Sequence, residues 1–294
     1  MAPSRSESPG SFRGILLAIF VAAHLPLASC TIAARHSPHL ANGGPSAAAT
    51  PLGSPLRLVV WNVHKKTDSV FLAELGSLLD SSRADIAMFQ EVAIPSDPQA
   101  FDRALRGRSW SISANLRRSD PPQEIGVATA SRSPAIGSEA MLSRSGEPLA
   151  GTRKAALATR HALGDRTLTA VNLHALNFSP TLDGFRHQLL EIASRLRGAD
   201  GPRVVAGDFN TWRHGKLALA DSILGSIGLE RLDFGNQESG KKRFLGNALD
   251  HVYYTPAHLV ADSASVRVHS RFKSSDHAPL EVVFFLKPPG APAR

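Results

Sequence analysis

The chain has 294 residues, of which 43% are hydrophobic and 20% charged, so it can bury a sizeable core in one large domain or two small ones and is not disordered throughout. Its single cysteine, Cys30, excludes an intramolecular disulfide and a cysteine-based zinc cluster. A formal charge of +8 favours polyanionic partners such as nucleic acid, anionic lipid or phosphorylated small molecules, although such a charge can also serve solubility alone.

Residues 1–30 have the pattern of a secretory signal. A polar segment with Arg5 and Arg13 precedes an apolar run that is shorter than the ~20 residues needed to cross a bilayer. The run ends in Leu27-Ala28-Ser29-Cys30, which is similar to the lipobox of bacterial lipoproteins, where the signal is cut before a cysteine that carries lipid. This resemblance predicts an exported protein, in the periplasm or at the cell surface, with lipid attached at Cys30. Secretion with a coincidental cysteine and an uncleaved anchor are the alternatives.

Residues 31–55 are rich in Ala, Ser, Pro and Gly, which is typical of a flexible linker, and residues 288–294 have the composition of a disordered tail. Removal of the signal would leave 31 Lys and Arg against 24 Asp and Glu, because Arg5, Glu7 and Arg13 leave with it. The basic character therefore belongs to the predicted domain, residues 56–287.

Apolar runs of strand length alternate with helical spacing from Leu56 onward. The first three elements are a strand over 56–61, a helix over 68–79 and a strand over 85–91. Further strands are predicted over 125–130, 155–161, 167–174, 203–207, 249–254, 265–271 and 280–286, and further helices over 181–197 and 215–227. This alternation predicts an α/β or α+β domain with central sheets covered by helices.

Six polar clusters lie at the ends of these strands. They are Trp61-Asn62-Val63-His64, Phe89-Gln90-Glu91, Asn172-Leu173-His174, Gly207-Asp208-Phe209-Asn210, Leu249-Asp250-His251 and Ser275-Asp276-His277. Single members have ordinary structural explanations: Asn172 fits a turn, and His64 and His251 fit hydrogen-bonded loop histidines. The whole set of acids, amides and imidazoles at strand ends predicts one functional site.

The residue types in these clusters suit metal-assisted phosphoester chemistry. Carboxylates at Glu91, Asp208 and Asp276, with the amide oxygen of Asn62, are the ligands that Mg²⁺ or Mn²⁺ prefers. Hydrolysis also needs a group that deprotonates water and a donor for the leaving oxygen. Asp208 with two histidines, 174 and 277, could fill these roles, and a carboxylate at 250 could fix the tautomer of a histidine.

In this order the clusters resemble the endonuclease/exonuclease/phosphatase superfamily, which includes DNase I-like nucleases, sphingomyelinases and inositol-polyphosphate phosphatases. The resemblance extends from about Leu56 to Phe285, and GDFN at 207–210 with SDH at 275–277 is its most specific part. WNVHKK, GDFNTW and LDHVYY look most like bacterial YafD-type members. The resemblance implies a four-layered α/β sandwich in which two central sheets are flanked by helices.

The resemblance also implies a metal site for Mg²⁺ or Mn²⁺. Glu91 looks like the main metal ligand, Asp276 like the second acidic residue of the metal site, and Asn62 like the residue that orients metal or phosphate. Arg132, at the end of the following strand, is a further candidate for a phosphate contact.

The remaining roles implied by the resemblance are catalytic. Asp208 looks like the residue that activates water, and Asn210 like the residue that holds the phosphate. His277 looks like the histidine that stabilises the phosphate, paired with Asp250. His174 occupies the position near the leaving group.

Together these features predict an exported, monomeric, divalent-metal-dependent phosphoesterase that hydrolyses phosphodiester bonds, with nucleic acid as the preferred substrate. One alternative is a phosphatase or phosphodiesterase that acts on phospholipid headgroups or inositol phosphates. A second is a non-catalytic surface binding protein on the same fold.

Overall fold

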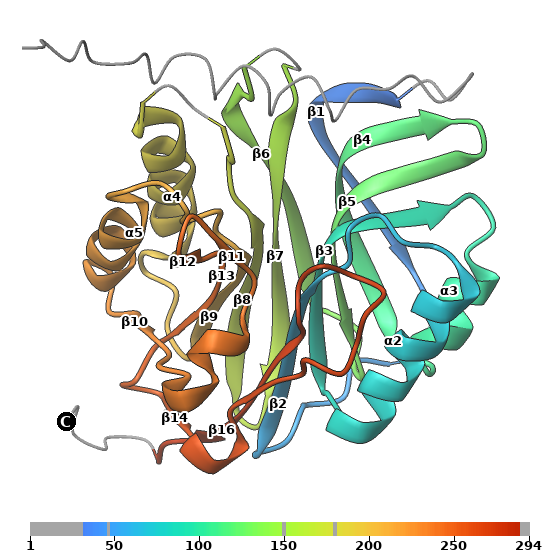
Figure 1. The fold of residues 1–294 in the computed structure, drawn as a ribbon. Coiled ribbons are helices and arrows are strands. Elements are labelled where there is room, and N and C mark those ends of the chain that lie inside the picture. The colour runs from blue at the N-terminus through green and yellow to red at the C-terminus, as the bar shows by residue number, and fades with distance from the viewer. Residues whose placement is uncertain (1–31, 46–47, 149–150, 179–180, 289–294) are drawn as a thin grey trace, which may run out of the picture.

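The computed structural model describes residues 32–45, 48–148, 151–178 and 181–288. In this part of the chain two β-sheets pack against each other, and helices cover their outer faces (Figure 1). The four-layered α/β sandwich expected from the sequence is therefore confirmed. The predicted signal with Cys30, and tail residues 289–294, lie outside the described residues. None of the helices that the structure describes is long and apolar enough to cross a membrane.

The first sheet has the strand order β1-β4-β5-β3-β2-β16-β14, and β15 also pairs with β16. Only β2 and β3 run parallel to each other among these pairs. The strands are β1 (Ile32–Gly43), β2 (Leu56–Asn62), β3 (Ile86–Pro95), β4 (Ser109–Ser119), β5 (Pro122–Ser131), β14 (Leu259–Ala261), β15 (Arg267–Val268) and β16 (Leu280–Leu286). Helices α2 (Ser69–Ser82) and α3 (Gln99–Ala104) cover its outer face.

The second sheet has the strand order β10-β13-β9-β8-β7-β6, with β8 and β9 parallel. Its strands are β6 (Gly137–Gly146), β7 (Arg153–Leu163), β8 (Arg166–His174), β9 (Arg203–Asp208), β10 (Glu230–Arg231) and β13 (Asp250–Tyr254). Helices α4 (Asp183–Leu196) and α5 (Lys216–Gly225) cover its outer face. The remaining elements are the short helices η1 (Gly235–Gly240) and η2 (Ser263–Ser265) and a hairpin of β11 (Arg243–Phe244) and β12 (Asn247–Ala248).

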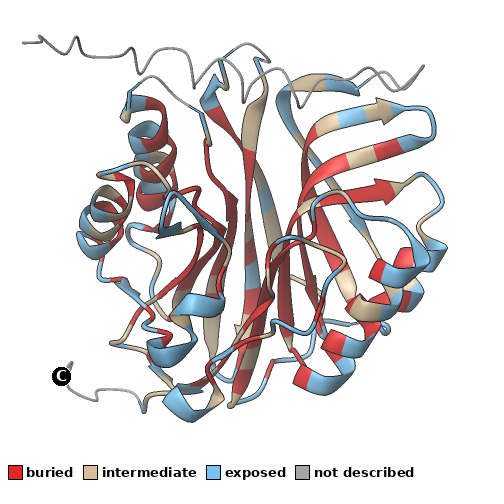
Figure 2. Ribbon diagram, in the orientation of Figure 1, coloured by how far each residue is buried: buried red, intermediate tan, exposed pale blue. Residues whose placement is uncertain are grey.

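Apolar side chains fill the space between the sheets, where most residues are buried (Figure 2). Val60 and Met88 of the first sheet pack in one cluster with Ala170, Ala206 and Val252 of the second. Burial of such side chains stabilises the fold by about 25 cal/mol for each Å² removed from water. The alanines on the second sheet are small, which allows the two sheets to approach closely.

The start and end of α2 follow from local chemistry. The Asp68 side chain accepts a hydrogen bond from the backbone N–H of Phe71 and so caps the first turn. Phe71, Leu75 and Leu78 then face the sheet, and the helix ends where Arg83 adopts a left-handed conformation. The predicted helix over 68–79 is confirmed and runs three residues further.

The prediction of a flexible linker over 31–55 is wrong for residues 32–43, which form strand β1 on the edge of the first sheet. Most of this strand is exposed or half-buried, so backbone hydrogen bonds to β4 hold it rather than apolar burial. The pairing is interrupted between Ala34 and His39, where Pro38 lacks an N–H. A strand of this kind leaves no apolar alternation in the sequence, and the linker composition misled the prediction.

The predicted strand over 265–271 is also largely wrong, because only Arg267–Val268 pair as a strand there. The following residues turn away from the sheet, and the backbone N–H groups of Lys273 and Ser274 donate to the Glu74 carboxylate on α2. This turn carries the chain toward Asp276 and His277.

We expect His161 to make the stability of the fold sensitive to acid. Its ring is buried in β7, and burial lowers its pKa to about 4. The unfolded chain binds a proton near pH 6.5 while the folded chain resists it until about pH 4, so stability falls as the pH drops through that window. Between pH 7 and pH 5 this one group should lower the free energy of unfolding by about 2 kcal/mol.

Urea unfolding of the wild type and of His161→Gln at the two pH values measures this effect. The variant should lose less stability on acidification, whereas the matched change His187→Gln at an exposed position on α4 should behave like the wild type. An equal loss in wild type and His161→Gln would contradict the prediction.

Candidate active site

Polar side chains from both sheets converge at one edge of the sandwich. Asn62 ends β2, His174 ends β8 and Asp208 ends β9, while the segment before β16 brings Asp276 and His277 to the same place. The pocket that they form has a volume of about 220 Å³. Seven of the predicted site residues line it: Asn62, Glu91, His174, Asp208, Asn210, Asp276 and His277. The eighth, Asp250, is buried behind His277.

Hydrogen bonds between the two sheets fix the opposite walls of this pocket. Asn62 Nδ2 on β2 donates to Asp208 Oδ2 on β9 across 3.0 Å. Gln90 Nε2 on β3 donates to Asn172 Oδ1 on β8 across 2.7 Å, and Asn172 Nδ2 donates in turn to the carbonyls of Phe89 and Ala128. The interpretation of Asn172 as a turn residue is therefore wrong, because it is a buried link between the sheets.

Unusual backbone conformations concentrate at the pocket. Seven non-glycine residues in the described part of the chain have a positive φ angle, and four of them lie here: His64, Lys65, Glu91 and Asn210. Glu91 sits where the pairing of β3 with β5 shifts register between Phe89 and Val92. Such a bulge re-aims a side chain, and the strain it costs is a common feature of functional sites.

The glycine of the GDFN segment is required by close backbone packing. Gly207 has a φ of +143°, and a Cβ placed on it would lie 2.0 Å from the carbonyl oxygen of Leu173. The missing side chain lets β9 approach β8 closely. His174 and Asp208 are therefore paired neighbours at the ends of two parallel strands.

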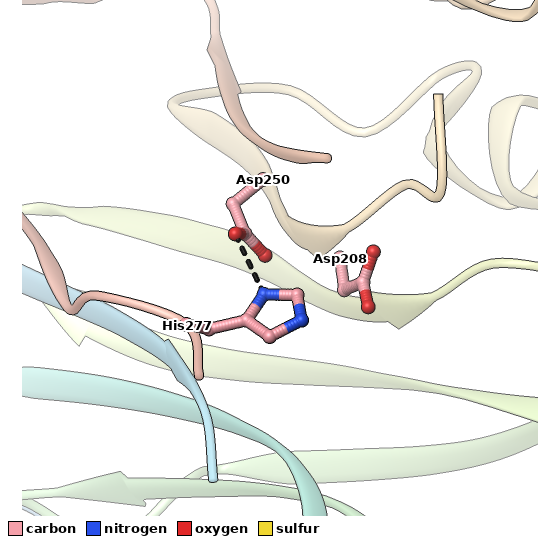
Figure 3. A group of neighbouring side chains, drawn as sticks. All are labelled: Asp208, Asp250 and His277. Atoms are coloured by element: carbon pink, nitrogen blue, oxygen red, sulfur yellow. Dashed lines mark hydrogen bonds and ion pairs between the residues drawn. The ribbon is translucent and has the colours of Figure 1, made fainter. Parts of the chain in front are cut away.

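His277 is held between two buried carboxylates (Figure 3). Its Nδ1 lies 2.8 Å from Asp250 Oδ2, and the other ring nitrogen points toward Asp208. Burial disfavours the charged ring, but Asp250 and Asp208 outweigh burial and raise the pKa of His277 to about 9. The ring therefore carries both protons at neutral pH. Trp61 Nε1 donates to the His277 carbonyl across 2.8 Å, which fixes the backbone of the loop.

Asp208 is buried and accepts two hydrogen bonds. One comes from Asn62 Nδ2 and the other, across 2.9 Å, from the backbone N–H of Asn210. Burial raises the pKa of this carboxyl group above its ordinary value, although the neighbouring histidines oppose the shift. A carboxylate of this kind is a better proton acceptor than an exposed one.

Cations surround the two acids at the mouth of the pocket. Lys65 forms an ion pair with Glu91, and Asp276 pairs with Lys242 at 2.6 Å and with Nδ1 of His64 at 2.9 Å. Burial alone would raise the pKa of Glu91, but His174, Lys65 and Lys154 hold it well below its ordinary value.

The pKa of Asp276 is about 2, since hydrogen bonds from His64 and Lys242 outweigh its partial burial. Both acids are therefore ionised at neutral pH. His64 is a hydrogen-bonded loop histidine as expected, since its ring bonds to Asp276, and it also lines the pocket.

His174 lies among charged groups on the floor of the pocket. Its Nε2 is 3.4 Å from Lys154 Nζ, 3.7 Å from Asp208 Oδ2 and 3.8 Å from Glu91 Oε1. Burial and the neighbouring Lys154 ammonium lower its pKa to about 4, so the ring is neutral at pH 7. Lys154 in turn pairs with Glu147 at 3.3 Å.

The donors at the pocket mouth fit a hard divalent cation. Glu91 and Asp276 supply ionised oxygens, and the Asn62 side chain supplies an amide oxygen that accepts only one hydrogen bond, from the backbone N–H of His64. Asp208, Asp250 and His277 also place one potential ligand atom each within 4.8 Å of one another. Because His277 holds a proton on each ring nitrogen, this second group is better described as an acid–imidazolium–acid arrangement.

A buried lysine fastens two loops of the site together. Lys216 at the start of α5 is fully buried, and its Nζ donates to the carbonyls of Leu176, Asn177 and Asn210 across 2.6, 2.9 and 3.1 Å. The ammonium also lies over the rings of Phe185 and Trp212. Burial lowers its pKa to about 8, and no feature of the sequence pattern singled it out.

Arg132 is not a phosphate contact in this arrangement. Its guanidinium donates to the carbonyl of Ala84 and lies 3.7 Å from Asp85, beside the beginning of β3. Glu91 lies toward the other end of that strand, so the prediction that Arg132 contacts phosphate is wrong. Strand β5 runs antiparallel to β3. The last residues of β5 therefore lie beside the beginning of β3, away from the site.

Two larger cavities lie elsewhere in the described part of the chain, but their chemistry is different. One, of about 470 Å³, is lined mainly by serines, threonines and glycines, with His161 as its one titratable side chain among the lining residues. The other, of about 460 Å³, lies between β6 and the end of α4 and has arginines with Glu139. Neither combines carboxylates with imidazoles and amides.

Comparisons with known proteins agree with this geometry. The sequence profile of the endonuclease/exonuclease/phosphatase family matches residues 59–277. A UPF0294 protein of Vibrio cholerae is 29% identical to the chain over 244 residues, which cover 82% of each protein.

Solved structures share the fold at low identity. An endonuclease/exonuclease/phosphatase from Beutenbergia cavernae has a TM-score of 0.60 at 17% identity and covers 79% of this chain and 71% of that one. D. rerio TDP2 complexed with a single-strand DNA product has a TM-score of 0.58 at 16% identity, with 79% and 99% covered.

Removal of the buried ammonium by Lys216→Met should loosen both loops. Three carbonyls would lose their charged donor, which should lower the free energy of unfolding by about 2–4 kcal/mol. Hydrogen exchange should quicken at residues 175–178 and 209–211 before the rest of the fold is affected. Lys273→Met, at an exposed position, is the matched control. If Lys216→Met and Lys273→Met had the same stability and exchange pattern, the fastening role would be refuted.

Proposed function

Since the chain belongs to the endonuclease/exonuclease/phosphatase family, we propose that it is a divalent-metal-dependent phosphoesterase that hydrolyses phosphodiester bonds in nucleic acid. The observation that carries the proposal is the division of charge in the pocket. Ionised Glu91 and Asp276 stand at its mouth, while the buried Asp208–His277–Asp250 arrangement stands behind them.

Asp208 would act as the base that takes a proton from the attacking water. Its burial keeps its basicity high, and the bonds from Asn62 and Asn210 orient its two oxygens. The water oxygen forms a bond to phosphorus, and the bond from phosphorus to the leaving oxygen breaks. His277, protonated and fixed by Asp250, would donate to a phosphoryl oxygen and stabilise the charge that develops there.

The leaving oxygen needs a donor, and His174 with Lys154 is placed to serve it. The neutral ring and the neighbouring ammonium lie 3.4 Å apart on the pocket floor. The Lys154 ammonium would give up a proton, directly or through the His174 ring, to the leaving oxygen as its bond to phosphorus breaks, and Lys154 would be left neutral. Asn210 would hold the phosphate. Its side chain is oriented by the hydrogen bond that it donates to the Ala175 carbonyl.

Glu91, Asp276 and the Asn62 oxygen would hold the metal, with Mg²⁺ or Mn²⁺ as the expected ion. A divalent ion bound there supplies positive charge that polarises the phosphoryl group. Lys65 and Lys242 now neutralise the two acids and would become available to phosphate oxygens.

Three observations favour nucleic acid as the substrate. The chain has a formal charge of +8. Its fold is similar to that of D. rerio TDP2, which was solved in complex with a single-strand DNA product. Aromatic side chains also line the phosphate pocket. The motifs WNVHKK and LDHVYY support a place among the YafD-type members.

The rival substrate, a phospholipid headgroup or inositol phosphate, has one observation in its favour. Leu245, at the tip of the β11–β12 hairpin beside the pocket, is 72% exposed. A non-catalytic binding role has weaker support, because the buried and strained groups of the pocket cost stability without serving adhesion.

Two substitutions should separate catalysis from metal binding. Asp208→Asn keeps the size of the side chain but removes the base, and should lower kcat on the order of 10²–10⁴-fold at saturating metal. Glu91→Gln removes one anionic ligand and should move the Mg²⁺ titration of activity to higher concentration. The assay uses single-stranded DNA, duplex DNA, RNA and phospholipid vesicles, with Mg²⁺, Mn²⁺ or EDTA.

An exposed acid away from the pocket provides the matched control. Asp97→Asn should leave both kcat and the metal titration unchanged, since Asp97 is exposed and caps only a local turn. Hydrolysis that survives in EDTA, or a Glu91→Gln enzyme with the wild-type titration, would refute the metal assignment. A fully active Asp208→Asn enzyme would refute the catalytic one.

We further propose that the protein is exported and carries lipid at Cys30. The support is the signal-like pattern of residues 1–30 and its lipobox-like end. In cells fed an alkyne-labelled fatty acid, the wild type should become labelled and sediment with membranes. Cys30→Ala should lose the label. A labelled Cys30→Ala protein, or an unlabelled wild type, would reject lipidation.

A further inference from the structure

Three aromatic side chains form a continuous surface along one side of the active-site pocket, where the phosphate would bind. Phe178 follows β8, Trp212 follows the GDFN segment and Phe244 belongs to the β11–β12 hairpin. The Trp212 ring centroid lies 5.9 Å from that of Phe178 and 5.5 Å from that of Phe244. All three line the same pocket as Asp208 and His277. Segments far apart in the sequence thus build one apolar surface beside the reacting groups.

Packing of the core does not account for these rings. Phe178 is 40% exposed and Phe244 is 41% exposed, and neither belongs to the apolar clusters between or behind the sheets. An exposed group of large apolar side chains costs hydration free energy, so it commonly marks a surface that binds a partner. Here the surface adjoins a pocket with phosphate chemistry, which indicates a ligand that has both phosphate and an apolar face.

Contacts within the protein hold Trp212, the central ring of the surface, in place. Trp212 Nε1 donates to Asn177 Oδ1 across 2.6 Å, and Asn247 Nδ2 donates to the Trp212 carbonyl across 3.0 Å. The Lys216 ammonium lies behind the indole, 5.9 Å from its ring. Trp212 is therefore fixed from three sides and supports the two more exposed rings.

The hairpin that carries Phe244 is equally constrained. Its two-residue turn has φ angles of +48° at Leu245 and +82° at Gly246, and the Arg243 guanidinium donates to the Gly246 carbonyl. Positive φ at both central residues gives the tight turn that matches the twist of two paired strands. A ring presented by such a hairpin loses little conformational entropy when it binds a ligand.

Positive charge beside the rings suits a phosphate backbone. Lys242 precedes the hairpin and lines the pocket, and Arg243 begins it. A strand of nucleic acid alternates negative phosphates with flat bases at short intervals, and single-strand binding sites combine basic side chains with aromatic rings in this way.

We propose that Phe178 and Phe244, supported by Trp212, form a stacking surface for an unpaired nucleobase next to the scissile phosphate. The inference rests on the proposed phosphodiesterase function and narrows its substrate to single-stranded or locally unpaired nucleic acid. A base within a duplex has both faces covered by its neighbours and cannot stack on these rings without leaving the helix.

A membrane is the rival partner of this surface. Apolar side chains that enter a bilayer project from the tip of a loop, and Leu245 does so, but the rings of Phe178, Trp212 and Phe244 line the pocket instead. The rings therefore face the place where the phosphate binds, which favours the base.

The test compares the full-length protein with Phe244→Leu and Phe178→Leu, which keep an apolar side chain but cannot stack. One substrate is a single-stranded oligonucleotide with one cleavable diester, and the other is the same strand with abasic residues beside that diester. Base stacking contributes about 1–3 kcal/mol, so kcat/KM for the normal strand should fall roughly 5- to 150-fold in each variant. Activity on the abasic strand should change little. Leu245→Ala, on the same hairpin, is the control and should resemble the wild type on both strands.

Equal losses on normal and abasic strands would mean that the rings only support the fold, and would overturn the proposal. Loss of hydrolysis or binding of phosphatidylcholine–phosphatidylglycerol vesicles in Leu245→Ala and Phe244→Leu, with oligonucleotide cleavage intact, would assign the surface to a membrane instead.

A binding measurement separates failure of this inference from failure of the proposed function. The Asp208→Asn protein is titrated by fluorescence anisotropy with the normal and the abasic strand, with Phe244→Leu added in a second series. Tighter binding of the normal strand that disappears with Phe244→Leu would support the stacking surface even if the wild type cleaved no nucleic acid. Absence of any base-dependent difference in binding would overturn it even if the wild type were an active phosphodiesterase.

Discussion

The hydrogen bonds that cross from one sheet to the other are the constraint on which the rest of the site depends. Apolar packing between two sheets tolerates small sliding motions, whereas a buried amide pair does not, because an unmade hydrogen bond there costs about 1–3 kcal/mol. The pair of Gln90 and Asn172 fixes the sheets near their common edge. The bond from Asn62 to Asp208 does the same at the site itself. One sheet thereby orients the Asp208 carboxyl group that the other sheet carries.

Burial divides the acidic side chains of the site into two kinds. Glu91 and Asp276 lie next to lysines and stay ionised, so they can serve as cation ligands. Asp208 and Asp250 lie deeper and share the imidazolium of His277 between them. Environments that push the pKa values of neighbouring groups apart are how one site can provide ligands, a base and a hydrogen-bond donor at a single pH. Here the depth of each residue at the sheet edge sets its chemistry.

The sequence was sufficient to predict the fold class and the residues at the strand ends, because a short apolar run that stops at Asp208 or Glu91 marks both a strand and its edge. It could not predict the partners that reach the site through long side chains. Lys154 lies at the start of β7, next to the edge strand β6, and Lys216 lies in a helix where an apolar residue would be expected. Their roles depend on where a flexible side chain ends in space, which local spacing does not encode.

The edge strand β1 and the position of Arg132 were also not predicted correctly from the sequence. Strand β1 is held by backbone hydrogen bonds to β4, which any side-chain composition can make, so its residues looked like a linker. Arg132 seemed close to the site because it follows a family strand, but β5 runs antiparallel to β3 and places it at the far end. Direction of pairing, rather than position in the motif order, decides which strand end joins the site.

The segment between Asn210 and Leu249 contains side chains that are particular to this chain, whereas the strand ends beside it carry the groups expected of the whole fold. The strand ends on either side of it supply Asp208 and Asp250, whose roles in the proposed function would serve any phosphoester. The segment itself supplies the buried Lys216 and the rings of Trp212 and Phe244. Loops that leave a rigid sheet edge can vary without disturbing the core. Residues that discriminate between substrates are therefore expected in such loops. The cross-sheet hydrogen bonds make this possible, since they hold the reacting groups in place whatever the loop presents beside them.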